Sequence, residues 1–118
     1  MRTYITAIFL FLFNLSYCQT TDIRYNSGEV SIYQGYDLIK RFNLPYGSVF
    51  IGWNSECILL IVGSDFRTMD HDGNFLSSLN IGYRKFIQIT QYEIIIKEDS
   101  NQNYYNSNFK SLRKLPIR

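Results

Sequence analysis

The sequence predicts an all-β fold, an antiparallel meander of about ten short strands with a pseudo-repeat of about 36 residues. Two observations predict it. After the first eighteen residues, short apolar runs rich in Ile, Val, Phe and Tyr alternate with clusters of Gly, Asn, Asp and Ser. In addition, residues 86–100, FIQITQYEIIIKEDS, resemble residues 50–64, FIGWNSECILLIVGS, at a distance of thirty-six positions.

The expected strands follow these apolar runs in order. One segment, YDLIKRF at residues 36–42, also fits a helical stripe of apolar residues, and we expect a strand there. The full set of expected strands is Glu29 to Gln34, Asp37 to Asn43, Ser48 to Trp53, Cys57 to Val62, Asp65 to Met69, Asn74 to Asn80, Lys85 to Thr90, Glu93 to Glu98, and two more around Tyr104-Tyr105 and Phe109 to Leu115.

The repeat extends beyond these two stretches. YDLIKRFNLPY at residues 36–46 lies over GNFLSSLNIGY at residues 73–83 at a distance of thirty-seven, and YYNSNFKSLRKLP at residues 104–116 lies over YQGYDLIKRFNLP at residues 33–45 as a partial third copy. The repeat units are approximately residues 29–64, 65–100 and a partial unit 101–118. Such periods are typical of supersecondary modules that stack on one another.

Within a unit, the segment ILLIVGSDFRTMDHDGNFLSSL resembles the inner part of a β-propeller blade, an apolar strand, a short turn, a second strand and a DG hairpin. The resemblance implies radially arranged sheets. Propellers close with at least about four blades, and this chain holds fewer than three. Either the units form a closed barrel or a trefoil-like arrangement, or a sheet edge stays open and pairs with another copy or a partner protein.

Residues 1–18 have the pattern of a cleaved export signal. Met1-Arg2 gives a positive start, YITAIFLFLFNL is an apolar run too short to span a bilayer, and small residues precede a cleavage site between Cys18 and Gln19. The alternatives are a lipid anchor on Cys18, against which Tyr17 argues by comparison with a bacterial lipobox, and a retained hydrophobic anchor. We expect a secreted or periplasmic protein with no stable membrane span after cleavage.

Residues 19–118 are enough for one domain. Without Arg2, the 12 basic residues become 11 against 10 acidic ones, so net charge recruits no polyanion. Without Cys18, Cys57 is the one remaining cysteine, and its place at the start of CILLIV predicts a buried, unreactive thiol.

The segment Asp70-His71-Asp72-Gly73-Asn74 is the most suggestive stretch chemically, and it predicts a hairpin turn with Gly73 at a positive φ angle. Its alternative is a weak Ca²⁺ site at Asp70 and Asp72, although the spacing does not fit an EF-hand. His71 is the only histidine, which excludes a zinc site built on several histidines of one chain. The sequence predicts no cofactor and no metal.

The sequence favours a non-enzymatic binding or interaction module. It contains no nucleophile elbow, no phosphate-binding glycine loop and no Cys–His pairing by spacing. The alternative is a small exported hydrolase whose carboxylates Asp65, Asp70 and Asp72 converge in a cleft; Glu98 with Asp99 is another carboxylate pair, and solvated turns explain it equally well.

Aromatic residues are the best sequence argument for binding. Tyr46 and Tyr83 recur between units and Trp53 aligns with Ile89 of the next unit, and we expect all three to pack in the core or between units. The expected surface group that could contact a ligand is Tyr33, Tyr36, Tyr104 and Tyr105. The basic end of the chain, with Lys110, Arg113 and Lys114, is expected to be a solvated edge, with no nucleic acid as partner.

Overall fold

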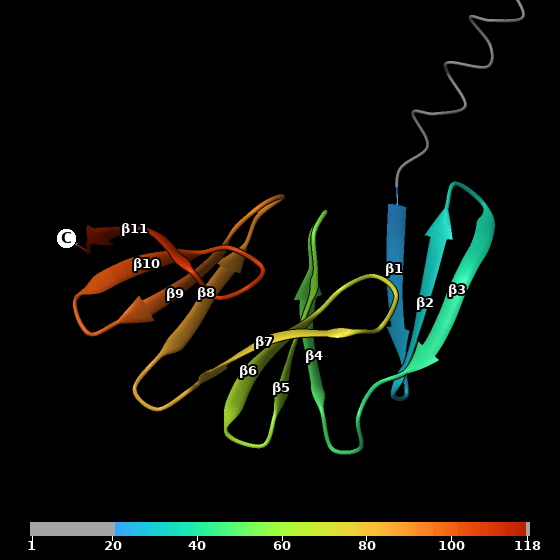
Figure 1. Ribbon diagram of the computed structural model, residues 1–118, viewed down its shortest axis with the longest axis horizontal. Coiled ribbons are helices and arrows are strands. Elements are labelled where there is room, and N and C mark those ends of the chain that lie inside the picture. Colours follow the sequence, from blue (N-terminus) through green and yellow to red (C-terminus); the bar gives the residue numbers. More distant parts are fainter. Residues whose placement is uncertain (1–20, 118) are drawn as a thin grey trace, which may run out of the picture.

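The computed structural model describes residues 21–117, which form eleven strands in three separate antiparallel sheets (Figure 1). Sheet 1 comprises β1 (Thr21–Asn26), β2 (Glu29–Gln34) and β3 (Asp37–Asn43). Sheet 2 comprises β4 (Val49–Trp53), β5 (Ile58–Val62), β6 (Asp65–Met69) and β7 (Phe75–Asn80). Sheet 3 comprises β8 (Lys85–Ile89), β9 (Ile94–Glu98), β10 (Asn101–Tyr105) and β11 (Ser111–Pro116). None of the described residues forms a helix that is long and apolar enough to cross a membrane.

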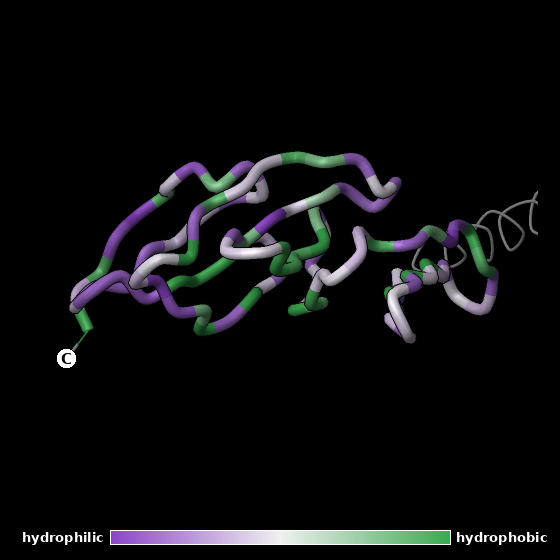
Figure 2. The backbone as a smooth tube through the Cα atoms, turned by 90° about the horizontal axis from the view of Figure 1, so that it is seen from below, coloured by the Kyte–Doolittle hydropathy of each residue, from purple (hydrophilic) through white to green (hydrophobic). Residues whose placement is uncertain are grey.

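The predicted all-β meander is confirmed, and so is the strand at residues 36–42, where a helix competed. Within each sheet every strand pairs with its neighbour in the sequence, because the connecting turns are short. The strands divide into three sheets that follow one another along the long axis of the molecule, so they do not form a single closed barrel (Figure 1). Figure 2 shows short hydrophobic stretches alternating with hydrophilic ones along the chain.

β1 is the one strand of the described chain that the sequence did not predict. Its sequence, TDIRYN, is mostly polar, and Ile23 is its one buried residue. A strand of an end sheet needs few apolar side chains, because only one face of that sheet packs against a core. Because β1 is mostly polar, the pattern of apolar runs did not predict it.

The pseudo-repeat appears in the pairing register of sheets 2 and 3. Asp65 of β6 pairs with Asn80 of β7, and Asn101 of β10 pairs with Pro116 of β11, thirty-six positions later at both ends. The irregularities repeat as well, because the register shifts between Phe50 and Gly52 in β4 and at the equivalent place in β8. Sheets 2 and 3 are therefore copies of one unit. When the chain is divided by sheets, the first of these copies begins at Val49 and the second at Lys85.

Sheet 1 repeats the last three strands of that unit. Glu29 pairs with Asn43, the counterparts of Asp65 and Asn80 at distances of thirty-six and thirty-seven, as the sequence alignment of residues 36–46 with 73–83 predicts. The predicted alignment of residues 104–116 with 33–45 is two positions out at its end. Pro116 corresponds through Asn80 to Asn43, because the register places it there, and not to Pro45.

Two hydrophobic cores join the sheets in sequence. In sheet 2, alternate residues of β5 point to opposite sides: Ile58 and Leu60 pack toward sheet 1, whereas Leu59 packs toward sheet 3. The first core also contains Ile23 and Val30 of sheet 1, and the second contains residues of β9 and β10. Sheet 2 is therefore buried on both faces, which explains why β5 is an unbroken apolar run.

The outward faces of sheets 1 and 3 are more polar than the equivalent faces of sheet 2, when residues at the same position of the repeat are compared. Asp22 and Arg24 of β1 correspond to the fully buried Ile58 and Leu60 of β5. At the other end, Lys97 of β9 is exposed and corresponds to Ile61, which packs against the second core. Polar outer faces of this kind are typical of the ends of a stack of repeats, and no further sheet among residues 21–117 covers them.

The predicted burial of Cys57 is confirmed, because its side chain is fully buried and unpaired with another cysteine. Burial raises the pKa of its thiol to about 12. The predicted packing of Tyr46 and Tyr83 is wrong. Both lie exposed in the connections between sheets, Tyr46 completely and Tyr83 by 58%. These equivalent tyrosines recur because the connections recur, and the connections run over the surface.

Candidate functional site

The strongest candidate site is a strand position beside β1. In sheets 2 and 3, β5 and β9 each pair on one side with an edge strand, β4 and β8 respectively. β1 holds the corresponding place in sheet 1, and no strand among residues 21–117 pairs with its outer side. Sheet 1 thus has three strands where its two copies have four.

The free side of β1 presents hydrogen-bonding groups. The two-residue turn between β1 and β2 has positive φ angles at Ser27 and Gly28, and it is closed by the pair Asn26–Glu29. Since such a closing pair is hydrogen-bonded and the pairs alternate along an antiparallel ladder, the backbone N–H and C=O groups of Ile23 and Tyr25 point away from β2. They point toward the unfilled position.

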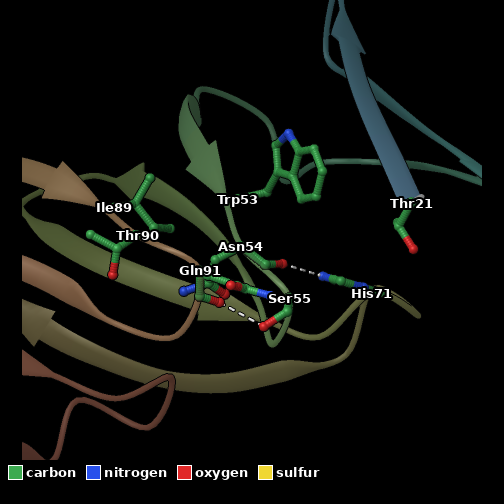
Figure 3. A pocket seen from close by; sticks show the side chains of 8 residues that line it. All are labelled: Thr21, Trp53, Asn54, Ser55, His71, Ile89, Thr90 and Gln91. Atoms are coloured by element: carbon green, nitrogen blue, oxygen red, sulfur yellow. Dashed lines mark hydrogen bonds between the residues drawn. The ribbon is translucent and has the colours of Figure 1, made fainter. Parts of the chain in front are cut away.

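A pocket of about 460 Å³ lies at the end of this position. Figure 3 shows Trp53, Thr21, His71 and the connections after β4 and β8 around it. It is lined by Thr21, Trp53, Asn54, Ser55, His71, Ile89, Thr90 and Gln91. Three sheets therefore contribute to its wall.

The repeat explains why Trp53 lies there. Between sheets 2 and 3, β4 approaches β8 so closely that a Cβ on Gly52 would be 3.1 Å from the side chain of Ile89. Trp53 is the counterpart of Ile89 one unit earlier, so it faces the position where sheet 1 lacks its edge strand. Its indole packs partly against the first core and lines the pocket with the rest. Trp53 therefore packs against the first core, as predicted, and in addition lines the pocket.

Polar side chains shape the floor of the pocket. Asn54 is 5% exposed. Its amide oxygen accepts hydrogen bonds from the backbone N–H groups of Glu56 and Cys57, both at 2.9 Å. His71 Nε2 lies 2.9 Å from the carbonyl oxygen of Asn54, whereas the hydroxyl of Ser55 donates to the carbonyl oxygen of Gln91 at 2.6 Å. His71 and Ser55 thus bind different groups and form no nucleophile–base pair.

The predicted turn at residues 70–74 is confirmed. Asp70 Oδ1 accepts from the N–H groups of Asp72 and Asn74, both at 2.9 Å, and Gly73 has a φ of 89°. The hydrogen bond from the Asn74 N–H is the main cause that holds the pKa of Asp70 below its usual value. The carboxylate is therefore used in closing the turn.

The carboxylates of the hydrolase hypothesis are not brought together. Asp65 begins β6 and Asp70 directly follows its last residue, roughly 16 Å away along an extended strand, and Asp65 binds the amide of Asn80 at 3.2 Å. Asp72 is exposed and forms an ion pair with Lys40. Among residues 21–117, no group of three or more His, Cys, Asp or Glu side chains could hold a metal ion.

The four tyrosines expected to contact a ligand lie on both end sheets. Tyr36 is fully exposed at the turn after β2, and Tyr33 lies under the guanidinium of Arg24 on sheet 1. Tyr104 of sheet 3 is half-buried beneath Arg113. The prediction that Tyr105 is a surface residue is wrong: it is 5% exposed, because β10 turns it toward the second core. The four tyrosines therefore do not form one surface for a ligand.

Sequence reasoning also missed a buried polar cluster around Glu98, which is 5% exposed. Its carboxylate contacts Arg84 and accepts hydrogen bonds from Asn103 at 2.6 Å and Tyr105 at 2.8 Å. Burial disfavours the charged carboxylate, but these three donors outweigh it and hold the pKa of Glu98 below its usual value. The pKa of Tyr105 is raised by burial and by Glu98. Tyr105 packs in the second core, and none of the residues of this cluster lines the pocket described above.

The basic residues near the chain end are partly paired internally. Arg113 binds Glu93 through two hydrogen bonds of 2.6 and 3.1 Å, and Lys114 lies 4.0 Å from Glu98. The predicted cleavage position, Cys18 and Gln19, lies outside the described residues. We found no match to this chain among protein-family models, curated proteins or solved structures.

Proposed function

We propose that this chain is an exported, non-enzymatic binding module whose open strand position beside β1 receives an extended segment of a partner polypeptide. The three sheets act as blade-like units in an open arrangement, as their resemblance to β-propeller blades implies. Export is supported by the signal pattern of residues 1–18. Residues 19–118 would then be the active form, secreted or periplasmic.

A single observation carries the proposal: among residues 21–117 no strand fills the edge position of sheet 1 that β4 and β8 fill in its two copies, and the pocket lies at that place. Strand addition supplies affinity through main-chain hydrogen bonds and specificity through alternate side chains. Ile23 and Tyr25 offer the main-chain groups. Trp53 offers an aromatic surface for a side chain of the added strand.

The geometry favours a single extended segment over the edge of a second copy. The open position is bounded by Trp53 and Ser55 on the side of sheet 2. If a second copy paired through its own β1, its own sheet 2 would come with that strand. The sheet 2 of the second copy would then collide with β4 of the first copy. A lone strand brings no such layer.

The chain itself provides a probe. Residues 85–93, KFIQITQYE, include β8, which fills the equivalent position in sheet 3, and they contain no tryptophan. Trp53 is the only tryptophan, so its fluorescence reports directly on the site. Titration of residues 19–118 with this peptide should give a saturable blue shift of Trp53 emission, since the added strand displaces water from the indole.

The matched control is the same peptide with Gln88→Pro. Gln88 pairs with Ile95, the counterpart of Ile23, so proline removes a backbone donor that the added strand needs. Binding that is abolished by this change supports strand addition. No saturable binding, equal binding of the proline peptide, or light scattering that shows a dimer formed without peptide would overturn the proposal.

A further inference from the structure

Hydrogen bonds join the connection after β4 to the connection after β8. They indicate which residue the bound segment carries beyond its strand. Ser55 lies two residues beyond β4, and Gln91 lies two residues beyond β8, thirty-six positions later. Ser55 donates twice to the carbonyl oxygen of Gln91, from its backbone N–H at 3.1 Å and from its hydroxyl at 2.6 Å. One unit thus binds the next through a residue just beyond its edge strand.

The receiving group for the preceding unit is the carbonyl oxygen of Ser55. It holds the place in sheet 2 that the Gln91 carbonyl holds in sheet 3, and it accepts no hydrogen bond from residues 21–117. Ser55 lines the pocket beside the open strand position (Figure 3). An acceptor is therefore exposed where the added strand would end.

We infer that the bound segment carries a serine or threonine two residues after its strand, whose N–H and hydroxyl both donate to the carbonyl oxygen of Ser55. This rests on the strand addition proposed above. A hydroxyl on Cβ lies close enough to its own backbone N–H for both to reach one oxygen, as Ser55 itself shows. Alanine lacks the second donor.

Three peptides that differ at one residue test this inference. Each is residues 85–93 with Gln91 replaced by Ser, Thr or Ala, and binding to residues 19–118 is measured by Trp53 fluorescence and by calorimetry. The Ser and Thr peptides should bind about 3- to 10-fold more tightly than the Ala peptide, the range expected for one hydrogen bond. The carbonyl ¹³C resonance of Ser55 should shift more with Ser than with Ala.

The outcomes separate this inference from the function on which it rests. If the Ser, Thr and Ala peptides bind with equal affinity and the Gln88→Pro control does not bind, strand addition stands and the hydroxyl preference is wrong. If none of the three binds, both are wrong. Tighter binding of Ser and Thr without a shift at the Ser55 carbonyl would also overturn the inference, because the hydroxyl would then be recognised elsewhere.

Discussion

The ring of Phe42 in sheet 1 lies only 3.2 Å from where a Cβ on Gly73 of sheet 2 would stand. In the next interface Leu79 takes the place of Phe42 and Phe109 takes the place of Gly73, both against the second core. Phe109 even keeps the positive φ of its glycine counterpart, 54° against 89°. The two interfaces thus differ in which sheet supplies the ring.

Gly73→Ala should lower the free energy of unfolding by about 1–2 kcal/mol, because alanine is strained at this φ and its Cβ meets Phe42. The measurement is urea denaturation. Gly47→Ala is the matched control, since Gly47 has a φ of 79° with nothing within 4 Å of an added Cβ. Adding Phe42→Leu should recover about 0.5–1 kcal/mol of the Gly73→Ala loss. Additive effects would show that no clash exists.

The Glu98 cluster should make stability depend on pH. The folded-state pKa of Glu98 is lowered, so its contribution is complete above its unfolded-state pKa of about 4.3 and is lost as the pH falls through the folded-state pKa. Glu98→Gln should cost about 1–3 kcal/mol at pH 7, and this cost should shrink in acid. Denaturation of Glu98→Gln and of the exposed control Glu56→Gln across pH 2–7 tests this. A cost that does not change with pH would contradict it.

The turn at Asp70 should accept asparagine but not alanine. Asn106 is its counterpart in sheet 3 and accepts the same two backbone hydrogen bonds, at 2.9 and 3.0 Å. Asp70→Asn should therefore change the stability at pH 7 by less than about 0.5 kcal/mol, whereas Asp70→Ala should cost about 1 kcal/mol, because two N–H groups lose their acceptor. Thermal unfolding of both variants is the measurement. Equal losses would mean that the turn needs the charge.

Strands and period were predictable because alternation and turn residues are local properties of the sequence. β1 was not, since Thr21–Asn26 carries few apolar residues. The burial of Glu98 and Tyr105 was hidden because a charged residue in a strand is expected at the surface unless its partners are known, and Arg84 comes from a separate connection. The site beside Trp53 depends on how successive sheets pack, and no local pattern encodes a missing neighbour.

The polar end of sheet 3 should be needed to keep the protein monomeric at that face. Lys97→Ile with Gln102→Phe gives sheet 3 the residues that sheet 2 carries at these places, Ile61 and Phe66, which pack in the second core. The double variant should self-associate in light scattering, because it exposes an apolar face. Lys85→Ala, which lowers the charge of the same sheet without adding a large apolar side chain, should not. A monomeric double variant would show that this face does not end the stack.

Amide hydrogen exchange of residues 19–118 tests the open strand position most directly. The N–H groups of Ile23 and Tyr25 should exchange much faster than those of their counterparts Leu59 and Ile61, which face β4 in sheet 2, and the residue 85–93 peptide should slow Ile23 and Tyr25 alone among these four. Slow exchange of Ile23 and Tyr25 in the free protein, or fast exchange that saturating peptide leaves unchanged, would contradict the account.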